Sequence, residues 1–163
     1  MSLLQPVVDK IGNLPLSQAI AESAYLFPAF ESAHVLALGI VFGSIAAVDL
    51  RLLNLRLTDQ SVLSLTKRLL PFTWIAFVGA VITGLLMFIA DPGRYLENLP
   101  FQLKFLLLAL AGVNMAINHF FVSRNMDQWG QPGHSTGAAK ISGGISLLLW
   151  TLIIFAGRWI GFS

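Results

Sequence analysis

Long apolar stretches without any Asp, Glu, Lys or Arg dominate the chain. Four of these uncharged segments have at least 17 residues. About 20 apolar residues are enough to cross a bilayer as an α-helix, within a range of roughly 17 to 25. We therefore predict four transmembrane helices, at about residues 27–49, 70–90, 102–123 and 141–160.

The segment 1–26 before the first span has an amphipathic pattern instead. Leu3, Val7 and Ile11 recur four residues apart, on one face of a helix, and Gly12 follows as a helix breaker. This pattern is typical of a helix that lies in the membrane interface, and a second short helix can follow it. The predicted fold is all-α: an integral membrane four-helix bundle with an N-terminal amphipathic interfacial helix, forming a single membrane domain over residues 1–163.

Composition supports a membrane protein and excludes several other classes. Hydrophobic residues make up 56% of the 163 residues and charged residues only 11%, against about 25% charged in soluble domains. The absence of cysteine excludes disulfides, thiolate metal sites and a cysteine nucleophile. The net charge is +2, but no basic stripe with interleaved aromatic residues is present, so we expect no nucleic-acid partner.

The cations predict the orientation of the helices in the membrane. Arg51, Arg56, Lys67 and Arg68 lie between the first two spans, and loops rich in Lys and Arg stay in the cytoplasm. We therefore expect a multi-pass protein of the bacterial inner (plasma) membrane with both termini in the periplasm.

Ionisable residues within spans are costly in lipid and are therefore candidates for function. His34 in the first span and Lys104 at the start of the third lie at a similar predicted depth near the outer boundary. His119 follows Lys104 by 15 residues, so it lies about 22 Å deeper at 1.5 Å per residue. One metal ion therefore cannot bind both His34 and His119 of one chain. Imidazole is a common axial haem ligand, and Lys104 or Met87 is a possible second ligand of His34.

Other polar residues near these spans each have two possible roles. Glu31 shares a helix face with His34, and Arg94 and Arg158, at the same level, can neutralise it or hold the propionates of a porphyrin. Asn118 can join helices by hydrogen bonds, or belong with His119 to a second, inner metal centre.

A further pair of charged residues lies at the inner end of the first span. Asp49 and Arg51 are two residues apart there. We expect them to be structural anchors that pair with each other, with Arg68 or with Arg124.

Several strings resemble an uncharacterised family of bacterial four-helix inner-membrane proteins. They are residues 27–35 (FPAFESAHV), 48–53 (VDLRLL), 68–74 (RLLPFTW), 101–104 (FQLK) and 156–161 (AGRWIG). This family is distantly similar to the superfamily that holds the HemJ-type protoporphyrinogen oxidase and the CopD-type copper-resistance membrane proteins. The resemblance implies haem b binding, with His34 and Lys104 at the positions of the enzyme's essential histidine and lysine.

The leading hypothesis is a haem b-binding membrane protein that acts in electron transfer or quinone-linked redox chemistry. It would hold one or two haems b, with His34 and His119 as the iron ligands of the two centres. Expected partners are membrane lipid, a quinone or a redox partner protein, and further copies of the chain in a homo-oligomer. The alternatives are an oxidoreductase that acts on a porphyrinogen, a CopD-like protein that handles copper or another metal, and a purely structural subunit.

Overall fold

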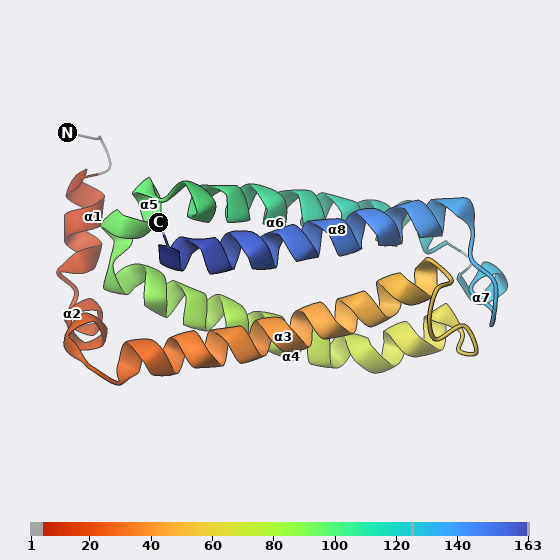
Figure 1. Ribbon diagram of the computed structural model, residues 1–163, viewed down its shortest axis with the longest axis horizontal. Coiled ribbons are helices and arrows are strands. Elements are labelled where there is room, and N and C mark those ends of the chain that lie inside the picture. Colours follow the sequence, from red (N-terminus) through yellow and green to blue (C-terminus); the bar gives the residue numbers. More distant parts are fainter. Residues whose placement is uncertain (1–4, 125, 163) are drawn as a thin grey trace.

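The protein is a bundle of four long helices with short helices at both ends (Figure 1). The computed structural model describes residues 5–124 and 126–162, and all regular elements in these ranges are helices. The long helices are α3 (Leu26–Leu52), α4 (Val62–Ala90), α6 (Leu99–Ile117), which the π-helical turn η1 (Asn118–Val122) continues, and α8 (Gly137–Trp159). The predicted all-α four-helix fold is therefore confirmed.

The two ends of the bundle carry different elements (Figure 1). One end, here called the terminal end, holds α1 (Gln5–Gly12), α2 (Pro15–Glu22), α5 (Pro92–Glu97) and η2 (Ile160–Phe162). The opposite end, here called the loop end, holds the α3–α4 connection and the connection from η1 to α8, which contains α7 (Met126–Trp129).

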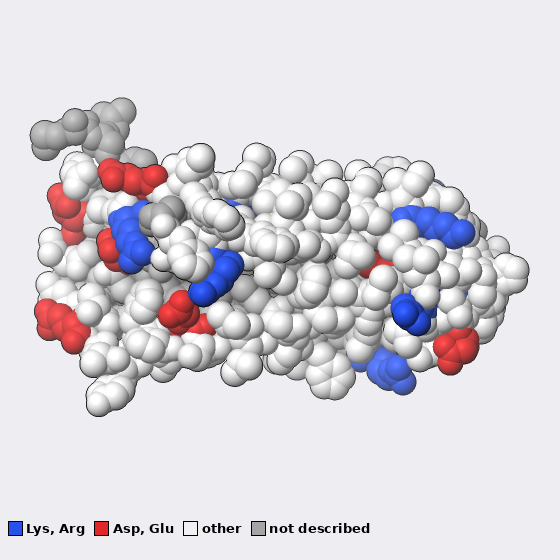
Figure 2. All heavy atoms as spheres, viewed as in Figure 1, with Lys and Arg blue, Asp and Glu red and all other residues white. Residues whose placement is uncertain are grey.

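All four long helices are long and apolar enough to cross a membrane. Large apolar side chains cover their outer surfaces, and Leu36, Ile75 and Phe121 are each more than 70% exposed. Charged residues on the face drawn in Figure 2 gather toward the two ends, and the middle is largely uncharged. A surface of this kind is stable in lipid and not in water, so the protein is a multi-pass membrane protein. Its orientation and the type of membrane stay predictions.

Three of the long helices begin earlier than the apolar pattern predicts, at polar N-caps. α4 begins at Val62 rather than near residue 70, because the Ser61 hydroxyl accepts a hydrogen bond from the backbone N–H of Ser64 at 3.2 Å. Asn98 caps α6 and Thr136 caps α8 in the same way. The uncharged stretch marks only the part of a helix that is in lipid, whereas the helix itself continues into the polar boundary as far as its cap.

The long helices pack as two pairs that meet along one side. α3 packs along α4, α6 packs along α8, and α3 also contacts α8. Gly143 allows this last contact, because a Cβ atom there would lie only 2.9 Å from Cβ of Leu52. α4 and α6 are not closely packed against each other within the described part of the chain.

The N-terminal amphipathic segment forms two short helices that cross the terminal end (Figure 1). The hydroxyl of Ser17 in α2 donates to the carbonyl of Ile89 at the end of α4 at 2.6 Å, and Ser17 and Ile20 are buried. α2 is therefore attached to the bundle itself. α1 has no buried residue and fits the predicted interfacial position. Leu3, part of the predicted pattern, lies outside the described residues.

Arg51 joins the two connections at the loop end, which corrects the expectation that it pairs with Asp49. Its side chain is fully buried and donates to the carbonyls of Gln60 at 2.6 Å, Gln131 at 2.7 Å and His134 at 3.3 Å. A guanidinium can reach both connections at once because it has five N–H donors in a planar fork. Sequence spacing could not reveal these partners, because they are backbone carbonyls of the loops, and those of Gln131 and His134 are 80 and 83 residues away in the chain.

Candidate functional site

His34 of α3 and Lys104 of α6 meet inside the bundle, in its terminal half. Nε2 of His34 lies 3.5 Å from Nζ of Lys104. This agrees with the similar depth that the sequence predicts for them. α3 and α6 belong to different helix pairs, so the two residues link the two halves of the bundle.

Helix α4 fixes the orientation of the His34 ring. Nδ1 lies 2.9 Å from the carbonyl oxygen of Ala80 and 3.0 Å from Oγ1 of Thr83. The Thr83 hydroxyl itself donates to the carbonyl of Gly79 at 2.8 Å. Because a carbonyl only accepts hydrogen bonds, the contact with Ala80 assigns the ring hydrogen to Nδ1. Nε2 is then the basic atom of the ring, and it faces Lys104.

Glycines from the two remaining helices complete the site. A Cβ atom on Gly84 of α4 would lie 3.1 Å from Cε1 of His34, and one on Gly157 of α8 would lie 3.5 Å from Nζ of Lys104. All four long helices therefore meet at the histidine–lysine pair. The sequence alone does not show that Gly84 and Gly157 face this pair, since only the fold shows what a glycine faces.

An aromatic cluster lies at the same end of the bundle. The rings of Phe88 and Phe101 stack with centroids 5.7 Å apart, and Tyr95 packs against Phe101 at 5.3 Å. Tyr95 belongs to α5, outside the spans, and burial raises the pKa of its hydroxyl. The cluster closes the terminal end between α4, α5 and α6.

The other residues predicted for this site are nearby in depth but are not joined to the pair by the hydrogen bonds of the described residues. Glu31 and Arg94 are exposed at the terminal end, and Met87 is partly buried in α4. Arg158 is also exposed, and its guanidinium lies 4.9 Å from the ring centroid of Phe162. Their roles as cofactor partners stay predictions.

The residues proposed for an inner centre lie apart from His34. Asn118 donates to the hydroxyl of Ser142 at 2.9 Å, so it joins α8 to the end of α6, as the helix-joining interpretation predicts. His119 is exposed on η1 and packs against the ring of Phe120. The described residues contain no group of three or more His, Cys, Asp or Glu that could hold a metal ion.

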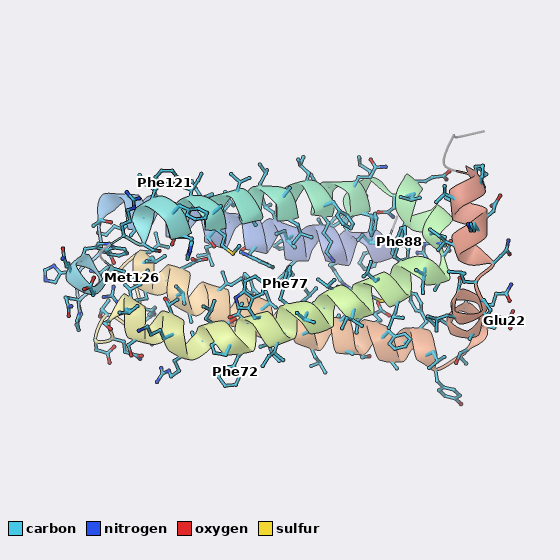
Figure 3. All side chains as sticks on the ribbon, turned by 180° about the vertical axis from the view of Figure 1, so that it is seen from behind. Glu22, Phe72, Phe77, Phe88, Phe121 and Met126 are labelled. Atoms are coloured by element: carbon cyan, nitrogen blue, oxygen red, sulfur yellow. The ribbon has the colours of Figure 1, made fainter. Side chains whose placement is uncertain are left out.

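A separate cavity of about 380 Å³ lies between the helices nearer the loop end. Phe77 points from α4 toward the α6–α8 pair, whereas Phe72 points away from the bundle (Figure 3). The polar residues that line the cavity are Ser44, Asp49, Thr66, Thr73, Asn114, Asn118, Ser142 and Ser146. Sequence reasoning did not predict this cavity, because no local pattern shows that α4 and α6 stay apart.

Fold and site together define a multi-pass α-helical membrane protein with a buried histidine–lysine pair. A model of a family of unknown function (DUF6644) matches residues 23–163, so the chain belongs to this family. Neither a curated protein nor a solved structure matches it. Membership of an uncharacterised family is therefore confirmed, and these comparisons give no support to the distant similarity to the HemJ-type and CopD-type proteins.

Proposed function

We propose that this protein binds haem b and acts in membrane electron transfer, with His34 as an axial ligand of the iron. The proposal rests on the way α4 holds the His34 ring. Histidines that bind metals usually donate their other ring N–H to a carbonyl or carboxylate, which fixes the tautomer and the ring orientation. His34 has this arrangement, with Nδ1 on the carbonyl of Ala80 at 2.9 Å and Nε2 directed to the bundle interior.

The surrounding residues are compatible with a haem group. Gly84 and Gly157 present no side chain toward the pair, and Lys104 supplies an amine on the side of Nε2. Arg94 and Arg158 are exposed cations at the same end and are suited to bind propionates. A bound haem b would supply one-electron transfer.

The copper-handling alternative finds less support in the structure. A path for a soft metal ion would need His34, Met87, Met115 and His119 in sequence. Met115 and His119 both lie on the exposed surface of α6 and η1. The porphyrinogen oxidase alternative uses the same pair of residues as the haem proposal, and complementation of a strain that lacks this oxidase would test it.

The test is an absorption spectrum of protein purified in detergent from haem-replete cells, oxidised and then reduced with dithionite. We expect a Soret band, a reducible α-band and about one haem per chain by pyridine haemochrome. One haem is expected because α4 holds the ring of His34, whereas His119 is exposed on η1. The variant His34→Ala should lose the haem, and the matched control His119→Ala should keep it.

Two results would overturn the proposal: a colourless wild-type protein, or an unchanged spectrum in His34→Ala. Far-UV circular dichroism would show that each variant keeps its helices. The variant Lys104→Met would then show whether the amine binds the iron, since replacing a nitrogen ligand by a thioether shifts the Soret and α-bands.

A further inference from the structure

The cavity near the loop end is open toward the lipid. Its lining includes Leu70, Trp74 and Met115, which are about half exposed on the outer surfaces of α4 and α6. α3 packs against both α4 and α8 and closes the opposite side. A volume of about 380 Å³ lies within the range of roughly 300 to 1,000 Å³ of small-molecule sites. A ligand can therefore enter sideways from the bilayer.

Two polar atoms in this region are buried and lack a partner. Oδ2 of Asp49 and Oγ1 of Thr66 have no hydrogen bond within the described part of the chain, and Asp49 is only 4% exposed. Both residues line the cavity. A buried polar atom without a partner is costly, so a ligand that bonds to these atoms would gain affinity.

The neighbouring polar groups are already bonded within the protein. Thr73 donates to Oγ of Ser44 at 2.8 Å, and the amides of Asn114 and Asn118 both bond to Ser142. The side chain of Arg51, the cation nearest to Asp49 in the sequence, is bonded to the loop connections. Oδ2 of Asp49 and Oγ1 of Thr66 are therefore the atoms to which a ligand would bond.

The rest of the lining selects for a flat, apolar ring. Trp74, Phe77 and Trp150 contribute aromatic faces to the cavity, and aromatic rings stack favourably in offset or edge-on geometry. Oδ2 of Asp49 can accept a hydrogen bond and the hydroxyl of Thr66 can donate or accept one, so a hydroxyl group on a ligand can bond to either atom. An aromatic ring with hydroxyl groups and an apolar tail meets all of these requirements.

We infer that this cavity binds the hydroquinone head of a membrane quinol, with a hydroxyl on Asp49 or Thr66 and the tail in the bilayer. A lipid acyl chain would fill the apolar part but leave both polar atoms unpartnered. The inference does not rest on haem binding. His34 precedes Val41, the first residue of the lining, by seven residues, or about 10 Å along the helix.

The test uses the full-length protein in phosphatidylcholine nanodiscs and the probe 2-decyl-1,4-hydroquinone, kept reduced. Trp74 and Trp150 line the cavity, so binding should quench tryptophan fluorescence saturably. The dimethyl ether of the probe has the same ring and tail but no hydroxyl donor. We expect it to bind about tenfold more weakly, as the loss of a hydrogen bond to a buried carboxyl predicts.

Variants test the cavity separately from the probe. Asp49→Asn keeps an acceptor oxygen at this position and should bind within about threefold of the wild type, whereas Asp49→Leu should bind about tenfold more weakly. Gly112→Leu puts a side chain at the cavity lining and should abolish saturable quenching. Gly39→Leu is its matched control, because both glycines have open space around an added Cβ but only Gly112 lines the cavity.

Two outcomes overturn the inference. Equal binding of the hydroquinone and its dimethyl ether would show that only an apolar group is recognised, as for a lipid acyl chain. Unchanged quenching in Gly112→Leu would show that the probe dissolves in the lipid or binds elsewhere. Both readouts use fluorescence and not the haem spectrum. A negative result here would therefore not contradict the haem proposal, and a colourless protein would not contradict quinol binding.

Discussion

Replacing Gly143 by alanine should weaken the contact between α3 and α8 and destabilise the whole bundle. A Cβ atom at this position would lie 2.9 Å from Cβ of Leu52 and 3.2 Å from the carbonyl oxygen of Asp49. Carbon atoms in normal contact are about 3.5–4.0 Å apart. Neither neighbouring atom is the end of a flexible side chain, so the two helices must move apart by about half an ångström or more.

The neighbouring Gly144 provides the control that isolates this effect. An added Cβ there would lie 3.7 Å from Cδ2 of Leu53, an ordinary contact. Both Gly→Ala changes gain helix propensity of up to about 1 kcal/mol, and this gain cancels when the variants are compared. Overpacking costs roughly 1–3 kcal/mol. The free energy of unfolding of Gly143→Ala should therefore be lower than that of Gly144→Ala by about this amount.

Unfolding of both variants in mixed micelles with increasing SDS would measure the difference, with helicity followed by far-UV circular dichroism. The expected result is an earlier transition for Gly143→Ala and a transition at or beyond that of the wild type for Gly144→Ala. If Gly143→Ala were as stable as Gly144→Ala, the close approach of α3 and α8 at this point would be refuted.

Two further predictions follow from the loop end and from the histidine–lysine pair. Arg51→Leu should destabilise the protein by at least roughly 3 kcal/mol, because it removes several hydrogen bonds to a charged group, each worth about 1.5–3 kcal/mol. Arg51→Lys should recover little of this loss in the same SDS titration, and full recovery would contradict a need for the guanidinium fork. Gly84→Ala should displace the ring of His34, because Cε1 of the ring lies 3.1 Å from the added Cβ, and this displacement should lower the haem content. Gly79→Ala is the matched control: its added Cβ has open space around it, so the haem content should not change. Equal haem content in the two glycine variants would refute this assignment.

Much of the architecture was predictable because it depends on local pattern. A helix in lipid satisfies its own backbone hydrogen bonds, so an uncharged run of about 20 residues predicts a span without knowledge of its neighbours. The rise per residue then predicts depth, which is why His34 and Lys104 could be placed at one level and His119 at another. The early start of α4 was missed because the caps lie in the polar boundary, where the apolar pattern has already ended.

The tertiary structure decided which faces of the helices meet. Sequence spacing allowed Asp49 and Arg51 to pair, but the fold bonds Arg51 to the loop carbonyls and leaves Oδ2 of Asp49 without a partner within the described residues. It also brought Gly84 and Gly157 from separate helices to the histidine–lysine pair.

The four helices, their membrane environment and the relative depth of their polar residues could therefore be predicted from local sequence pattern, because each depends on residues close together in the chain. The rotation of each helix about its axis and the choice of packing partners depend on contacts between distant segments. Such distant contacts leave α4 and α6 without close backbone packing against each other within the described residues. That separation leaves a cavity lined by residues from all four long helices.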